Sequence, residues 1–136
     1  MTATGPRAAL ASRYLRLVAP AAAATCAAGV LGYLPTRRMA GAGALAGMVG
    51  GCAIGMVAGA LGAFPIALAG AGSAAARLQA ALLSMGLRFG IVVLLGLAAV
   101  WSGWFARGPL LAWMAISYTV QLIAETRFAV KDAGGR

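Results

Sequence analysis

Long uncharged stretches, separated by short clusters of arginine, dominate the pattern of this chain of 136 residues. A bilayer core about 30 Å thick requires roughly 20 apolar residues in each helix that crosses it, and the uncharged stretches have that length. The pattern therefore predicts an all-α integral membrane protein with four transmembrane helices in two hairpins and no soluble domain. We expect the spans at residues 15–34, 40–63, 86–106 and 109–126.

Prolines set two of the expected boundaries. Pro35 is expected to end the first span, with "PTRRM" as the turn to the second. The uncharged stretch from Met39 to Ala76 is too long for one span, and Phe64-Pro65 divides it, because proline lacks an N–H and disfavours helix before it. Residues 64–85 are then expected to form a partly helical cytoplasmic connector. A re-entrant segment or fifth span there, and a cleaved signal peptide at the first span, remain open alternatives.

Composition and charge agree with a membrane protein. Hydrophobic residues make up 62% of the chain, charged residues 10%, and the net charge is +9. The cations lie between apolar runs, where they indicate topology and contacts with the lipid bilayer rather than binding to nucleic acid. Three cations fall in two of the loops, Arg37, Arg38 and Arg107, and the other eight fall in the termini and the connector. The positive-inside rule therefore predicts that both termini are cytoplasmic.

Glycine recurs at every fourth position of the second span: Gly43, Gly47, Gly51, Gly55 and Gly59. In water each would cost a helix roughly 0.5–1 kcal/mol relative to alanine. In lipid, small residues instead allow a second helix to approach closely. The spacing predicts a groove for helix packing. Its partner is either another helix of this chain or a helix of a second copy or another protein.

Residues suited to catalysis are scarce. The chain has no histidine and only two acidic residues, and it lacks the glycine-rich loop that holds nucleotide phosphates. Cys26 and Cys52 lie inside apolar runs, where we expect neither a disulfide nor a metal site. The sequence therefore predicts a protein that is not an enzyme and that uses no cofactor.

One pair of charges is expected near the membrane boundary. Arg88 lies near the start of the third span and Glu125 near the end of the fourth, at similar distances along the chain from the turn near Arg107. An unpaired carboxylate beside hydrocarbon is costly, so we expect an ion pair between Arg88 and Glu125, with Gln121 one turn away and sharing its hydrogen bonds. The alternative is that each charge meets water or a lipid headgroup separately.

Several stretches together resemble a known family. They are two tight hairpins, a glycine-spaced span ending in "GALGAFPIALAG", an alanine-rich connector, and "LLSMGLRFGIVV" at the start of the third span. In these features the chain is similar to ATP synthase protein I, a small membrane protein encoded beside the F-type ATP synthase. The resemblance covers roughly Arg37 to Glu125, and its most specific parts are the glycine run and "MGLRF" with Arg88.

The resemblance implies a non-catalytic accessory of the ATP synthase membrane sector that aids assembly or stability of the c ring. The implied partners are membrane subunits of the ATP synthase, the c ring first and the a subunit as a second candidate, and the implied location is the bacterial inner membrane. A part in magnesium or calcium uptake has been proposed for the family. A small homo-oligomeric ion or solute carrier is therefore the alternative function.

Overall fold

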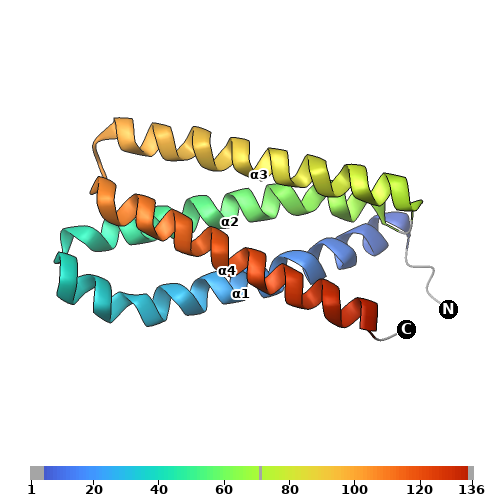
Figure 1. Ribbon diagram of the computed structural model, residues 1–136, viewed down its shortest axis with the longest axis horizontal. Helices are drawn as coiled ribbons and strands as arrows, with labels where there is room; N and C mark the ends of the chain where they lie inside the picture. Colours follow the sequence, from blue (N-terminus) through green and yellow to red (C-terminus); the bar gives the residue numbers. More distant parts are fainter. Residues whose placement is uncertain (1–4, 71, 135–136) are drawn as a thin grey trace.

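The computed structural model describes residues 5–70 and 72–134 and consists of four α-helices (Figure 1). They are α1 (Pro6–Ala40), α2 (Gly43–Ala69), α3 (Ala74–Ser102) and α4 (Arg107–Gly134). The described residues contain no strand, so the prediction of an all-α fold is confirmed.

Three of these helices are long and apolar enough to cross a membrane: α1 from Arg7 onward, α2 and α3. Helix α4 also has sufficient length, with 28 residues, but it carries Ser117, Thr119 and Gln121 within its apolar sequence. The helices therefore indicate a membrane-embedded protein with three candidate spans among the described residues.

Helix α2 is the central element of the bundle. It packs against each of the other three helices, with α1 and α3 on opposite sides of it (Figure 1). Helix α1 also packs against α4, whereas α3 and α4 touch at few points. Helix α1 begins and α4 ends at the same end of the bundle as the α2–α3 turn, and we call this the terminal end.

The two prolines do not end helices as the sequence suggested. Helix α1 continues through both Pro20 and Pro35 to Ala40, and α2 continues through Pro65. Proline removes one backbone hydrogen bond but keeps a helical φ angle, and a helix in an apolar medium has no water to replace its other bonds. Glycines with positive φ follow the helices instead, since this conformation requires no Cβ: Gly41, Gly70 and Gly103.

The expected connector at residues 64–85 is mostly continuous with the two helices beside it. Its first residues complete α2, and α3 begins at Ala74, where the hydroxyl of Ser73 accepts a hydrogen bond from the amide of Ala76 at 3.3 Å. Among the described residues there is no separate re-entrant element in this stretch. As a result Arg88 lies at the midpoint of α3 rather than near the start of a helix.

The buried residues of α2 are alanine and glycine apart from Met48, and many large apolar side chains of the bundle face outward. Ala44, Ala58 and Ala67 are each 2% exposed, whereas Met39 is 88% exposed and Trp101 is 81% exposed. This distribution suits helices surrounded by lipid, because hydrocarbon around the protein favours apolar side chains on its outer surface.

Candidate functional site

The glycines of α2 lie against α4 of the same chain. A methyl group on Gly47 would stand 3.0 Å from the backbone nitrogen of Leu110, and one on Gly51 would stand 2.8 Å from the carbonyl oxygen of Leu110. A methyl group on Gly55 would stand 2.8 Å from Cβ of Ser117. Real Cβ atoms do not approach other atoms this closely, so α4 occupies the space that side chains on α2 would need.

Four of the five predicted glycines take part in this contact. Gly59 faces the carboxamide of Gln121, whereas a methyl group on Gly43 would meet nothing within 4 Å. Gly62, which the spacing of four had not included, lies under the side chain of Arg88 from α3. Of the two partners that the sequence left open for the groove, the structure contains the chain's own α4.

Helix α4 presents a matching row of residues four apart, which we call the polar seam: Trp113, Ser117, Gln121 and Glu125. The first three bond to side chains of other helices. The indole nitrogen of Trp113 donates to Oγ1 of Thr36 at 3.1 Å, and Oγ of Ser117 donates to Sγ of Cys52 at 3.6 Å. The turns at Trp113 and Ser117 are therefore tied to α1 and α2, respectively, as well as packed against glycine.

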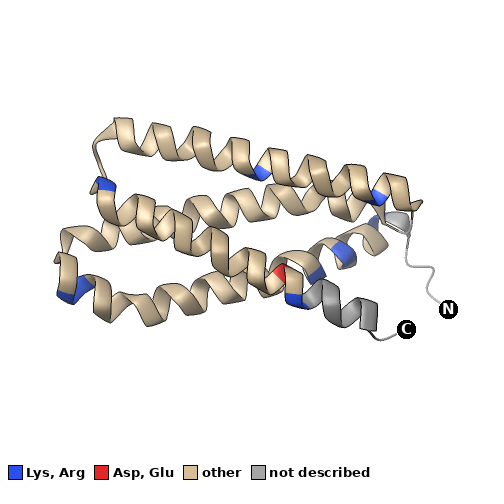
Figure 2. Cartoon of the chain, viewed as in Figure 1, with Lys and Arg blue, Asp and Glu red and all other residues tan. Residues whose placement is uncertain are grey.

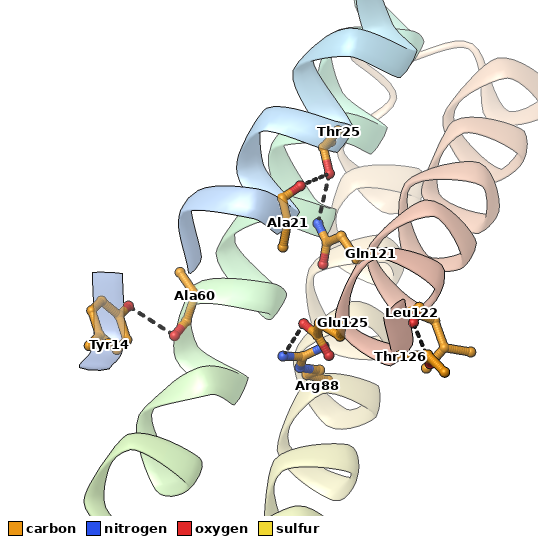
Figure 3. A network of polar contacts seen from close by, with 9 residues as sticks. All are labelled: Tyr14, Ala21, Thr25, Ala60, Arg88, Gln121, Leu122, Glu125 and Thr126. Atoms are coloured by element: carbon orange, nitrogen blue, oxygen red, sulfur yellow. Dashed lines mark hydrogen bonds and ion pairs between the residues drawn. The ribbon is translucent and has the colours of Figure 1, made fainter. Parts of the chain in front are cut away.

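The last member of the polar seam, Glu125, forms an ion pair with Arg88 (Figure 3). The Nη2 and Nη1 atoms of Arg88 lie 2.6 Å from Oε1 and 2.7 Å from Oε2 of Glu125, so the guanidinium binds both carboxylate oxygens. The Arg88 side chain is 8% exposed and that of Glu125 is 28% exposed. This geometry gives two parallel charge-assisted bonds, which are the strong form of this interaction.

The ion pair also joins two helices that otherwise scarcely touch. Helices α3 and α4 both pack on α2, and the bond between Arg88 and Glu125 closes the gap between them on the side of Gly62. The Nε atom of Arg88 is buried there without a hydrogen-bond partner. The small volume of Gly62 leaves the space that the arginine side chain occupies.

Gln121 does not share its hydrogen bonds with the ion pair, contrary to the expectation from sequence. Its Nε2 donates to Oγ1 of Thr25 on α1 at 3.1 Å, and Thr25 in turn donates to the carbonyl oxygen of Ala21 at 2.9 Å. Gln121 is 3% exposed and Thr25 is 1% exposed. The amide therefore ties α4 to α1, because Thr25 supplies a buried acceptor that Glu125, already bound to Arg88, does not.

Sequence reasoning missed three residues of this site. Thr25 looked like an isolated hydroxyl in an alanine-rich span, Gly62 falls outside the spacing of four, and Gly32 lies under the indole ring of Trp113. The signal available for each was a small or hydroxyl-bearing residue inside a span, which is common in membrane helices and does not identify its partner.

The side-chain bonds of this site hold helices to one another. Cys26 and Cys52 are free, and the described residues include no group of three His, Cys, Asp or Glu side chains that could hold a metal ion. Of the two acidic residues in the chain, Glu125 is already engaged by Arg88. Comparisons of the chain with protein-family models, with curated proteins and with solved structures find no match.

Proposed function

We propose that this chain is a non-catalytic accessory of the F-type ATP synthase membrane sector that aids assembly or stability of the c ring. The proposal rests on a contact between the two segments that carry the most specific part of the sequence resemblance. Arg88 of "MGLRF" packs directly on Gly62, at the end of the glycine run. The residues that resemble ATP synthase protein I therefore form one structural unit.

In this proposal α4 is a fourth transmembrane helix. Its inward-facing polar residues lower its hydropathy, but those of the polar seam bond within the bundle. A polar group paired inside a helix bundle does not face hydrocarbon, which removes the main obstacle to crossing the membrane. The close contact with α2 along four glycines also supports α4 lying beside α2 over the thickness of the membrane.

The distribution of cations supports an orientation with both termini in the cytoplasm of a bacterial cell. Figure 2 shows Lys and Arg at the end of the bundle opposite the terminal end and spread along the terminal half. By their positions in the helices, the described cations of the terminal half are Arg7, Arg13, Arg16, Arg77 and Arg127, and those of the opposite end are Arg37, Arg38 and Arg107. Arg88 lies at the midpoint of α3. Cytoplasmic segments carry the excess of Lys and Arg in membrane proteins.

An accessory role fits the packing better than the alternative role of ion or solute carrier. A carrier requires a polar route through the bundle, and intramembrane polar residues often mark one. Here α4 touches α2 so closely at Gly51 and Gly55 that no methyl group fits between them, and the approach at Gly47 is nearly as close. This contact leaves no route between α2 and α4 at these glycines, and the outer faces of the helices remain for partners.

The outer face of α3 is the place to test for partner contact. Gly86 and Gly90 are exposed, and a methyl group on either would meet nothing within 4 Å of this chain. A Gly90→Leu variant therefore keeps the bundle intact while it obstructs the approach of another helix. Gly43→Leu is the matched control, because Gly43 is equally open but lies on α2 at the opposite end.

The experiment compares source cells with and without the gene and measures the yield of assembled c ring. We expect a lower yield of c ring in the deletion strain. The wild-type chain and Gly43→Leu should restore the yield, whereas Gly90→Leu should not. Mass spectrometry should identify the c subunit among the proteins that co-purify with the wild-type chain. Unchanged c-ring yield together with the absence of ATP synthase subunits from the purified protein would refute the proposal. Loss of magnesium or calcium uptake with normal c rings would support the carrier instead.

A further inference from the structure

A pocket between α1 and α2 takes no part in the ion pair. Its volume is about 270 Å³. Aliphatic side chains dominate its lining, and the polar side chain that reaches it is the Gln121 carboxamide. The lining includes Val18 and Ala22 from α1 and Met56, Val57 and Ala60 from α2.

Two hydrogen bonds connect α1 to neighbouring helices, one on each side of the pocket along the axis of α1. Figure 3 shows both bonds. Toward the terminal end, Oη of Tyr14 donates to the carbonyl oxygen of Ala60 at 2.9 Å. On the other side, Nε2 of Gln121 donates to Oγ1 of Thr25 at 3.1 Å. The stretch of α1 between Tyr14 and Thr25 is roughly 16 Å long at 1.5 Å per residue. This length is close to half of a hydrocarbon core about 30 Å thick, which corresponds to one lipid leaflet.

The pocket is open to the medium that surrounds the bundle. Met56 is 36% exposed and Val57 is 44% exposed, so part of the lining lies on the outer surface. Around a protein with mean hydropathy +0.92 and outward-facing apolar side chains, that medium is hydrocarbon. The molecule that such a medium supplies to an elongated apolar pocket is a lipid acyl chain.

One exposed arginine, Arg13, stands at the terminal side of the pocket. Its guanidinium reaches across from α1 to Gly70 at the end of α2. Arg16 lies two residues before Val18 and therefore on another face of α1. Guanidinium groups bind phosphate oxygens in a fork geometry and remain charged at all physiological pH values. A phosphate held at Arg13 would lie five residues before Val18, so the attached acyl chain would enter the pocket from its terminal side.

We propose that the pocket binds one acyl chain of an anionic phospholipid whose phosphate is held by Arg13. The bound lipid then fills the gap between α1 and α2, which lies between the bond from Tyr14 to α2 and the bond from Gln121 of α4 to Thr25. This inference does not depend on a role in ATP synthase assembly, because it concerns the isolated chain in a membrane.

The first test fills the pocket. The purified full chain is reconstituted in bilayers of equal phosphatidylglycerol and phosphatidylcholine, extracted in mild detergent, and analysed by native mass spectrometry. We expect one retained phosphatidylglycerol per wild-type chain and none for Ala22→Phe. The matched control is Ala19→Phe, on an exposed position of α1 outside the lining, and it should retain the lipid. Val57→Trp fills the pocket from α2 and serves if Ala22→Phe does not fold.

The second test addresses the headgroup. Arg13→Gln should lower the preference for phosphatidylglycerol over phosphatidylcholine about fivefold, the size expected for one cation near an anionic membrane surface. Arg107→Gln, at the opposite end of the bundle, should leave the preference unchanged. Lipid retention by folded Ala22→Phe or Val57→Trp at the wild-type level would overturn the proposed site. Equal retention of both lipids by the wild type, or equal effects of the two arginine changes, would overturn the preference for an anionic headgroup.

Discussion

A Gly51→Ala substitution tests whether close contact between α2 and α4 holds the bundle together. The added methyl group would stand 2.8 Å from the carbonyl oxygen of Leu110 and 2.9 Å from both the backbone nitrogen of Met114 and Cβ of Trp113. None of these atoms belongs to the flexible end of a side chain. Relief of the clash therefore requires α4 to move away from α2.

The expected cost follows from two opposing effects. Alanine improves helix propensity over glycine by up to about 1 kcal/mol, whereas an extra group in a closely packed core costs about 1–3 kcal/mol. A shift of α4 by 0.5–1 Å, in order of magnitude, also weakens the neighbouring contacts at Gly47 and Gly55 by a quarter to a half. We expect a net loss of about 2 kcal/mol, roughly a 30-fold change in the unfolding equilibrium.

Tryptophan fluorescence during titration with sodium dodecyl sulfate, in mixed micelles, measures this change. Trp113 is 8% exposed and belongs to the polar seam, whereas Trp101 and Trp104 are 81% and 84% exposed. Replacing these two with phenylalanine makes the signal specific to the seam. The control is Gly43→Ala, which should be no less stable than the parent because its methyl group meets nothing within 4 Å. Equal stability of Gly51→Ala and Gly43→Ala would refute the reasoning.

Three further predictions concern the polar groups and the topology. Arg88→Ala and Glu125→Ala should each lower the free energy of unfolding, by about 3 kcal/mol where a buried charge is left unpaired. The double variant should lose less than the sum of the two single losses, because both changes remove the same ion pair. Additive losses in the same titration would exclude coupling between the two residues. Thr25→Val should cost roughly 0.6–1.7 kcal/mol through loss of the bond from Gln121, and a Thr25→Ser variant that keeps the hydroxyl should recover most of it. A phosphatase reporter fused after Arg136 should be inactive, and a green fluorescent protein fused at the same point should be fluorescent, because both termini are expected in the cytoplasm. An active phosphatase and a dark fluorescent protein would mean an odd number of spans.

The pattern of the chain alone was sufficient to predict the helical class and the number of helices. Apolar stretches of membrane-spanning length are a direct consequence of the solvent, since a chain in lipid must satisfy its backbone hydrogen bonds within each helix. The same pattern marked the glycines of α2 as a packing surface and Arg88 and Glu125 as residues at similar depth. These inferences need only periodicity and distance along the chain.

The helix ends were harder to predict because proline does not end the helices of this chain, and because glycines inside α2 do not interrupt it. Pro35 and Pro65 lie inside α1 and α2, and positive-φ glycines follow the helices. Loss of one hydrogen bond at a proline does not end a helix when the medium supplies no other partner for the remaining backbone groups. The expected connector consequently became part of α2 and α3, and Arg88 moved from an expected boundary to the middle of α3.

Only the tertiary structure decided which surfaces meet. Glycines four apart specify a groove but not its occupant, and α4 of the same chain occupies it from Gly47 to Gly59. Likewise Gln121 could bond to Glu125 or to any buried acceptor, and the position of α1 selects Thr25. Such choices depend on the crossing of helices far apart in sequence. Small and hydroxyl-bearing residues pack well against many partners in lipid, so their sequence alone does not identify the one they contact.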